Sequence, residues 1–192
     1  MRALGIGSSP EKGGITDILL DKALEGARSE SALTEKIILN DLDFKPCQEC
    51  GGCGKTGACS LHDDMRIVYK AFDSAGALII ASPVFFGSVS AQLKMMIDRF
   101  HCIWVAKYVL KNRPVRKMPQ KGVFLCAAGQ DKKEYFENSK EIVKIFFKVQ
   151  GIEYFGGLFF GGYNVKSTDT EEKEVFLRRA FELGASLVKS FC

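Results

Sequence analysis

The chain has 192 residues, of which 46% are hydrophobic and 26% charged, and it carries a net charge of +4. This length and composition suit one globular domain with a substantial core and exclude a disordered chain. No apolar run reaches the roughly 20 residues of a membrane-spanning helix, so we expect no membrane partner. Residues 1–7 turn straight into a Gly/Ser/Pro segment without the apolar stretch of a signal peptide, so we expect a cytoplasmic protein.

Apolar patterning in the first part of the chain predicts two strands, two helices and one long loop. In chain order these are strand Ala3–Ser8, helix Ile15–Arg28, strand Leu33–Asn40, loop Asp41–His62 and helix Met65–Ser74. Asp63 or Asp64 can cap the second helix, because a carboxylate accepts the free N–H groups of a first turn. The loop is far longer than an ordinary connection, and such loops in compact domains are usually functional.

The rest of the chain predicts three more strands, each followed by a helix. These are strand Ala77–Ala81, a helix opened by Ser88 or Ser90 and running through Phe100, strand Gly122–Ala127, helix Lys132–Val149, strand Ile152–Phe160 and a final helix. The capping box Thr168-Asp-Thr-Glu171 opens the last helix, which runs nearly to Cys192.

Strands alternate with helices along the whole chain, which predicts an α/β fold with helices on both faces of a parallel sheet. Five strands at this spacing suit the doubly wound order 2-1-3-4-5. We find no internal repeat and no second domain, so we expect a single domain over residues 1–192 with a cysteine-rich loop at 41–62.

The turn after the first strand combines small residues, hydroxyls and a helix start, which together suit a phosphate. Its candidate contacts are Ser8, Ser9, Pro10, Lys12, Gly14, Ile15 and Thr16. Pro10 stands where the dinucleotide fingerprint has its third glycine, so a Rossmann NAD site is disfavoured, and the P-loop pattern is absent. The simpler alternative is an ordinary turn between a strand and a helix.

Two further loops are expected at the same edge of the sheet, beyond the carboxyl ends of the third and fourth strands. The residues concerned are Pro83, Val84, Phe85, Phe86 and Gly87 in one loop, and Ala128 and Gly129 in the other. In the order 2-1-3-4-5 the first and third strands flank the switch point where ligands bind. Phosphate donors opposite an aromatic wall predict a site for a phosphorylated aromatic ring. The alternative is that both phenylalanines are packing residues.

Four of the seven cysteines lie close together in the long loop, at Cys47, Cys50, Cys53 and Cys59. Glycines between them allow the tight backbone turns that wrapping around a group requires. Three cysteines at successive three-residue steps resemble the compact runs that ligate iron–sulfur clusters, whereas zinc prefers separated pairs or Cys/His mixtures. Zinc and free or oxidised thiols remain alternatives, and His62 is a conceivable further ligand. Cys126, in a buried strand, is expected to be a core residue.

Three segments of the chain resemble the NAD(P)H-dependent FMN reductases of flavodoxin-like fold. They are the phosphate turn, the segment Cys47–Met65 and above all Ser82-Pro-Val-Phe-Phe-Gly-Ser-Val-Ser-Ala-Gln-Leu-Lys-Met-Met-Ile-Asp-Arg99. The compact cysteines make the chain most similar to the iron–sulfur flavoprotein branch of that family. The resemblance implies FMN in the crevice, a 4Fe-4S cluster on the four cysteines and a homo-oligomer, dimeric or tetrameric, in which clusters and flavins of different subunits lie near each other.

The chain departs from the family pattern at three positions. Glu11 stands where the phosphate turn often has Arg, Ile15 replaces an Asn, and Phe85 replaces a Tyr. A carboxylate near a phosphate is unfavourable, so we expect Glu11 to point to solvent and Lys12 to supply the missing charge.

Between Lys107 and Lys121 the chain has six basic residues and no acidic one: Lys107, Lys111, Arg113, Arg116, Lys117 and Lys121. They can attract the phosphates of NADPH or an acidic electron-transfer protein, although a solvated loop is the simpler interpretation. We predict no nucleic-acid partner.

The sequence therefore predicts an FMN-dependent oxidoreductase that passes electrons between NAD(P)H or a small redox protein, FMN and a 4Fe-4S cluster, with a small-molecule or protein acceptor. The flavin is the expected redox centre, without an essential acid or base side chain. Two alternatives remain: a clusterless NAD(P)H:flavin or quinone reductase, and a metal-binding redox sensor or interaction protein without turnover.

Overall fold

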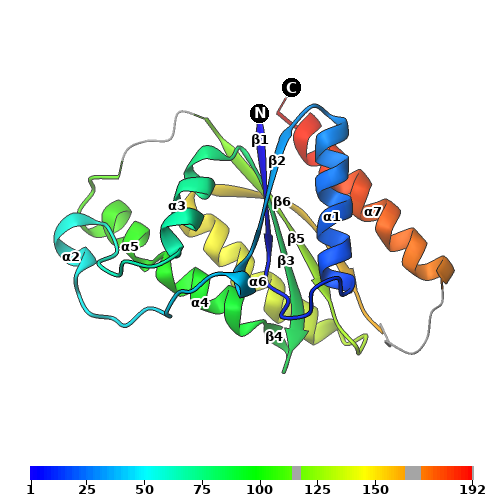
Figure 1. Ribbon diagram of the computed structural model, residues 1–192, viewed down its shortest axis with the longest axis horizontal. Helices are drawn as coiled ribbons and strands as arrows, with labels where there is room; N and C mark the ends of the chain where they lie inside the picture. The colour runs from blue at the N-terminus through cyan, green and yellow to red at the C-terminus, as the bar shows by residue number, and fades with distance from the viewer. Residues whose placement is uncertain (114–117, 163–169, 192) are drawn as a thin grey trace.

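Five parallel strands form the centre of the computed structural model, which describes residues 1–113, 118–162 and 170–191 (Figure 1). The strands are β1 (Arg2–Gly7), β2 (Leu33–Ile38), β3 (Ala77–Phe85), β5 (Gln120–Ala127) and β6 (Ile152–Phe160). Their order is β2-β1-β3-β5-β6, and every neighbouring pair is parallel. The predicted doubly wound order is confirmed. The sequence did not predict β4 (Ser88–Val89), which pairs antiparallel with the end of β3.

Helices cover both faces of this sheet (Figure 1). One face carries α1 (Ile15–Ser29) and α7 (Thr170–Lys189), and the other carries α3 (Met65–Ser74), α4 (Ala91–Arg99) and α6 (Lys133–Gln150). Shorter pieces are η1 (Leu39–Asp41), α2 (Cys53–Thr56), α5 (His101–Trp104) and η2 (Val105–Val109). None of the helices in the described part of the chain is both long and apolar enough to cross a membrane.

The core has two halves, because alternate residues of a strand face opposite sides of the sheet. In β3, Leu78 and Ile80 pack with the helices α3, α4 and α6, whereas Ile79 packs with α1 and α7. All three side chains are fully buried. Burial on both faces explains why these strands read as continuous apolar runs in the sequence.

Helices α1 and α7 cross with their backbones almost in contact. A Cβ atom on Gly26 would lie 1.9 Å from the carbonyl oxygen of Phe181, and one on Gly184 would lie 1.9 Å from that of Ala23. Only glycine fits at either position.

Most predicted boundaries agree with the structure to within two residues, and two differ by more. The strand expected to end at Ala81 continues to Phe85, because its last two residues pair with β4. The helix expected to end near Phe100 continues through α5 into η2, which has π-helical hydrogen bonding. The predicted capping box begins at residues 168 and 169, which lie outside the described residues, and α7 is described from Thr170.

Candidate functional site

Three loops meet at the carboxyl edge of the sheet, because β1, β3 and β5 are neighbours and run in the same direction. The first loop joins β1 to α1, the second is the turn between β3 and β4, and the third joins β5 to α6. All three lie along the lower edge of Figure 1. The structure therefore brings the predicted phosphate turn and both predicted ring loops to one edge.

Buried serines join these loops. Ser8 donates from Oγ to the carbonyl oxygen of Ala81 at 2.9 Å, and Ser90 donates from Oγ toward Ser8, with 2.9 Å to both its carbonyl oxygen and its Oγ. Ser82 Oγ accepts from the backbone N–H of Ser90 at 3.0 Å. All three serines are fully buried. The Ser8 hydroxyl, predicted to contact a phosphate, is thus engaged in holding β1, β3 and the start of α4 together.

The phosphate turn combines features that favour and oppose an anion. The first turn of α1 leaves backbone N–H groups without partners inside the helix, and Gly13 adopts φ +70 with open space on its Cβ side. However, the Glu11 carboxylate lies over Gly14, where an added Cβ would be 2.8 Å from its Oε2. The depression lined by Gly7, Ser9, Glu11, Lys12, Thr16, Asp17 and Ile38 measures about 10 Å³, room for about one water molecule.

Lys12 is also placed differently from the prediction. Its Nζ forms an ion pair with Asp41 Oδ1 at 2.7 Å, across the mouth of the turn. Both side chains are exposed, so the pair is weak and exchangeable. Glu11 is exposed, as expected, although its carboxylate folds back toward Gly14. Lys12, expected to supply the missing positive charge, is paired with Asp41 instead.

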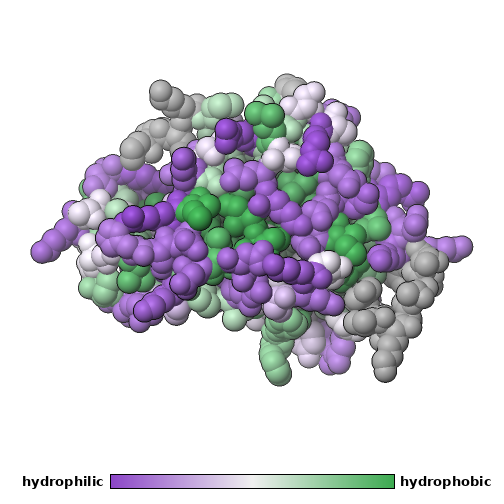
Figure 2. All heavy atoms as spheres, viewed as in Figure 1, coloured by the Kyte–Doolittle hydropathy of each residue, from purple (hydrophilic) through white to green (hydrophobic). Residues whose placement is uncertain are grey.

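The predicted aromatic loop is a tight hairpin. Phe86 and Gly87 occupy its turn with φ +50 and +73, the signs that a type I′ turn requires at both central positions. Asn138 holds the turn by donating to the Gly87 carbonyl oxygen at 2.7 Å. Phe86 is fully exposed, and the hydrophobic projection at the lower edge of Figure 2 coincides with this hairpin in Figure 1. Pro83 and Val84 are half-buried at the base.

The third loop follows β5. Ala128 is buried and donates its N–H to the carbonyl oxygen of Phe160 at 2.9 Å, whereas Gly129 is exposed. Its backbone is therefore accessible at the edge that carries the other two loops.

Sulfur atoms dominate a second site at the outer end of the molecule, where the cysteine loop packs beside α5 (Figure 1). Cys47, Cys50, Cys53 and Cys59 all line one cavity of about 350 Å³, which we call the thiol cavity. No three His, Cys, Asp or Glu side chains of the described residues converge as they would on a single ion. The four thiols therefore share one cavity without converging on a point, whereas a single zinc ion needs sulfur ligands at about 2.3 Å.

Glycines shape this loop as the sequence suggested. Gly51 and Gly57 adopt φ +72 and +75, and Gly57 approaches Ala106 so closely that an added Cβ would lie 2.7 Å from that methyl group. A Cβ on Gly52 would lie 2.6 Å from Ser60 Oγ. The loop is thereby fixed to η2 and folded back on itself.

The thiols differ in their surroundings. Cys50 is exposed, and its contact with Ser60 Oγ at 3.3 Å together with the Gly52 N–H lowers the pKa of its thiol. Burial raises the pKa of Cys53, and the neighbouring thiols raise it further. The six described cysteines are all free of disulfides.

Arg99, a residue that the sequence did not single out for this site, lines the thiol cavity and is held by Asp63. Arg99 lines the cavity with its side chain 1% exposed, and it binds Asp63 through both carboxylate oxygens at 2.6 and 3.0 Å. Asp63 was predicted as a helix cap, and its Oδ1 does accept from the Met65 N–H at 3.2 Å. Asp63 lies in the segment Cys47–Met65 and Arg99 ends the segment Ser82–Arg99. Their place in these two family-like segments was the signal that could have identified them.

His62 does not line the thiol cavity; its Nδ1 accepts from the guanidinium of Arg66. Two residues that the sequence did not single out for this site, His101 and Cys102, line it instead. Cys102 is buried, which raises the pKa of its thiol.

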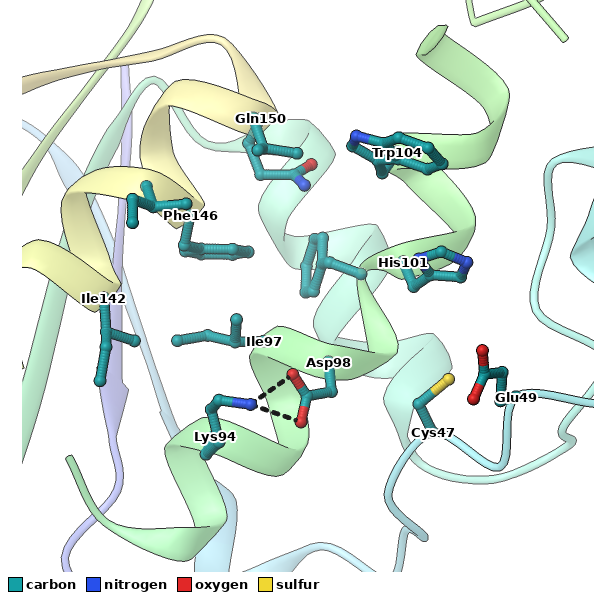
Figure 3. Close-up of a pocket in the computed structure, with 13 residues that line it drawn as sticks. Cys47, Glu49, Lys94, Ile97, Asp98, His101, Trp104, Ile142, Phe146 and Gln150 are labelled. Atoms are coloured by element: carbon teal, nitrogen blue, oxygen red, sulfur yellow. Dashed lines mark hydrogen bonds and ion pairs between the residues drawn. The ribbon is translucent and has the colours of Figure 1, made fainter. Parts of the chain in front are cut away.

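An apolar cavity of about 520 Å³ adjoins the thiol cavity (Figure 3). It lies between α6, which contributes Ile142 and Phe146, and α4–α5, which contribute the stacked rings of His101 and Trp104. Cys47, Glu49 and His101 border both cavities. The cysteine loop is therefore reachable from an aromatic-lined surface.

The basic stretch is largely structural where it is described. Lys107 donates to the Val149 carbonyl oxygen at 3.0 Å, Arg113 donates to Gln150 Oε1 at 3.1 Å, and Lys121 donates to the Ser190 carbonyl oxygen at 2.8 Å. Arg116 and Lys117 lie outside the described residues.

The sequence pattern of the NADPH-dependent FMN reductases matches residues 1–160. The chain belongs to the NADPH-dependent FMN reductase family. An iron-sulfur flavoprotein of Methanocaldococcus jannaschii is 38% identical over 113 residues, which are 59% of this chain and 58% of that relative's length. An iron-sulfur flavoprotein of Archaeoglobus fulgidus is 29% identical over 191 residues, covering 100% of this chain and 80% of the relative.

Among solved structures, the NAD(P)H:quinone oxidoreductase of Methanothermobacter marburgensis superposes with a TM-score of 0.73 and 22% identity, covering 97% of this chain and 96% of that one. This likeness confirms the flavodoxin-like fold of the FMN reductase family.

Proposed function

We propose that the protein is an FMN-dependent oxidoreductase that passes electrons between NAD(P)H or a small redox protein, FMN and a 4Fe-4S cluster. The observation that carries this proposal is the lining of a single cavity by all four motif cysteines in a chain of the FMN reductase family. The names of the two iron-sulfur flavoproteins above support it.

The FMN phosphate would lie at the N-terminal turn of α1, with Ser9, Pro10, Lys12, Gly14, Ile15 and Thr16 around it. The Ser8 hydroxyl is bonded to Ala81 and Ser90, so Ser8 would hold the turn in place rather than contact the phosphate through its side chain. The ring would lie against Pro83–Gly87 and the backbone of Ala128 and Gly129. Helix dipole and free N–H groups favour the phosphate, and the exposed aromatic turn favours the ring.

Cys47, Cys50, Cys53 and Cys59 would hold the cluster. FMN exchanges two electrons with a nicotinamide or single electrons with a carrier, and a 4Fe-4S cluster exchanges one. In Figure 1 the cysteine loop stands apart from the β3–β4 hairpin, with α4 between them. This separation favours a homo-oligomer, dimeric or tetrameric, or a carrier that connects the two sites. A small-molecule or protein acceptor would approach at the exposed thiols of Cys47 and Cys50.

Anaerobic purification followed by absorption spectroscopy and analysis of FMN, iron, sulfide and zinc tests this function. We expect stoichiometric FMN with about four irons and four sulfides per chain. Replacing Cys50→Ser should abolish the broad brown absorption and leave the flavin bands. The matched control Cys126→Ala, which changes a thiol buried in β5, should retain both.

Other outcomes identify the alternatives. Yellow protein without iron would indicate a clusterless NAD(P)H:flavin or quinone reductase. Colourless protein that holds zinc tightly and does not bind added FMN would indicate a redox sensor or interaction protein.

A further inference from the structure

Arg99, which lines the thiol cavity, has a buried donor without a hydrogen-bond partner among the described residues. Its Nη1 donates to the Lys45 carbonyl oxygen at 2.7 Å and to Asp63 Oδ2 at 2.6 Å, and its Nη2 donates to Asp63 Oδ1 at 3.0 Å. Its Nε is buried and has no hydrogen-bond partner among the described residues. An unmade hydrogen bond of a buried charged group is costly, so a native protein normally supplies a partner.

The guanidinium cannot swing away to find that partner elsewhere. Asp63 binds it through both carboxylate oxygens. Tyr69 donates from its hydroxyl to the Arg99 carbonyl oxygen at 2.8 Å, a bond to the backbone that does not involve the guanidinium. Burial by itself would lower the pKa of Arg99, but the hydrogen bonds to Asp63 raise it above its usual range, so the side chain is always charged.

Sulfur lies next to this donor. Cys59 lines the thiol cavity beside Arg99, and its thiol contributes to the raised pKa of the Arg99 guanidinium. Both residues line the thiol cavity. A sulfur acceptor inside the cavity would therefore satisfy Nε without moving the arginine.

We propose that Arg99 Nε donates a hydrogen bond to a sulfur atom of the group held by the four cysteines and thereby raises its reduction potential. This inference rests on the proposed function, because it requires the cluster. Taking up one electron from the donor makes the cluster one unit more negative. A fixed cation with its N–H aimed at sulfur stabilises the reduced state more than the oxidised state. Asp63 is a positioning residue that keeps the arginine aligned.

A purely structural role for Arg99 makes a different prediction. In that case the arginine only ties the end of α4 to the loop around Lys45 and Asp63. Its replacement would then lower stability and leave the midpoint potential unchanged.

The first test compares midpoint potentials in redox titrations monitored by electron paramagnetic resonance. Arg99→Lys keeps a positive charge and removes Nε–H. We expect the equilibrium constant for reduction of the cluster to fall about tenfold. For a one-electron couple this lowers the midpoint potential by about 59 mV. Tyr69→Phe is the matched control, because it removes the hydrogen bond to the Arg99 backbone and leaves the guanidinium intact. It should reduce stability and keep the potential.

A second measurement uses the unaltered protein, so it does not depend on a variant that folds. Protein grown with arginine labelled by ¹⁵N at Nε is reduced and examined by pulsed electron paramagnetic resonance. Arg99 is the one arginine that lines the thiol cavity in the described part of the chain. A ¹⁵N coupling to the reduced cluster is the expected result.

Absence of that coupling in protein that contains iron and sulfide would overturn the inference and leave the proposed function intact. A potential of Arg99→Lys equal to that of the unaltered protein would do the same. Protein that assembles no cluster anaerobically would overturn both.

Discussion

Ser90 donates a hydrogen bond from its Oγ to the carbonyl oxygen of Ser8, 2.9 Å away and 82 positions earlier in the chain. The same Oγ accepts from the N–H of Leu93 and so caps α4. One hydroxyl thus joins the phosphate turn to the helix that follows the aromatic hairpin.

Replacing Ser90→Ala should lower the free energy of unfolding by about 2 kcal/mol, since a helix cap and a buried hydrogen bond are both lost. Urea unfolding monitored by circular dichroism measures the change. Ser88→Ala, in the adjacent β4, is the control and should change it by less than about 0.5 kcal/mol. Equal losses in the two variants would contradict this account.

Glu11 should weaken FMN binding. Its carboxylate lies over Gly14, at the N-terminal turn where we place the phosphate. Replacing Glu11→Gln should tighten FMN binding roughly threefold to tenfold at low salt, because it removes a like charge at short range. Quenching of FMN fluorescence measures the dissociation constant.

The control for that experiment is Glu25→Gln. This variant removes an exposed carboxylate of α1, which pairs with Lys22 and lies away from the phosphate turn. It should leave the dissociation constant unchanged. A gain that persists undiminished at high salt would argue against an electrostatic cause.

Phe86 should lower the free energy of unfolding. It combines φ +50 with a fully exposed ring, so its side chain adds backbone strain without burial. Phe86→Asn should raise the free energy of unfolding by about 1 kcal/mol, because Asn tolerates the left-handed region. The same variant should also weaken FMN binding, because we place the flavin ring against Phe86. Fluorescence titration measures this change.

Gly87→Ala supplies the opposite case. Its φ of +73 disfavours any side chain, and an added Cβ would lie 3.1 Å from the Tyr135 ring. We expect a loss of about 1 kcal/mol or more. A Phe86→Asn variant less stable than the unaltered protein would show that the exposed ring makes stabilising contacts.

The Asp63–Arg99 pair should make stability depend on acid pH. Burial by itself would raise the pKa of Asp63, but the bonds from Arg99 and from the N–H groups of Lys45 and Met65 lower it below its usual range. A carboxyl whose pKa is lowered on folding stabilises the protein above its unfolded pKa of about 3.9 and loses that contribution as the pH falls further.

At neutral pH, Asp63→Asn should cost about 3 kcal/mol, because it leaves a buried guanidinium without its counter-charge. The difference from the unaltered protein should shrink as the pH falls below about 4 and Asp63 becomes protonated. Urea unfolding at several pH values between 3 and 7 measures it. A difference that stays constant over this range would refute the assignment.

Uninterrupted apolar runs such as Ala77–Ala81 predicted the central strands, because a strand buried on both faces leaves that pattern directly in the sequence. The order of the strands followed from their alternation with helices. The aromatic hairpin was harder. Its turn is Phe86-Gly87 rather than the Asn-Gly that signals a type I′ turn, so β4 escaped notice.

The candidate sites were predictable as residue sets and less so as geometries. The motif cysteines do share one cavity, as their spacing suggested. The partners of Ser8, Lys12 and Arg99 were hidden, since each lies more than 25 positions away in the sequence. Local patterns carry no record of such long-range pairing, so the ion pair of Lys12 with Asp41 was not predicted.

The close crossing of α1 and α7 has a mechanical consequence. At Gly26 and Gly184 no side chain separates the two backbones, so the helices have nothing that can slide or repack between them. We therefore expect the two helices to move together, and the amide protons of α1 to be among the last to exchange with solvent.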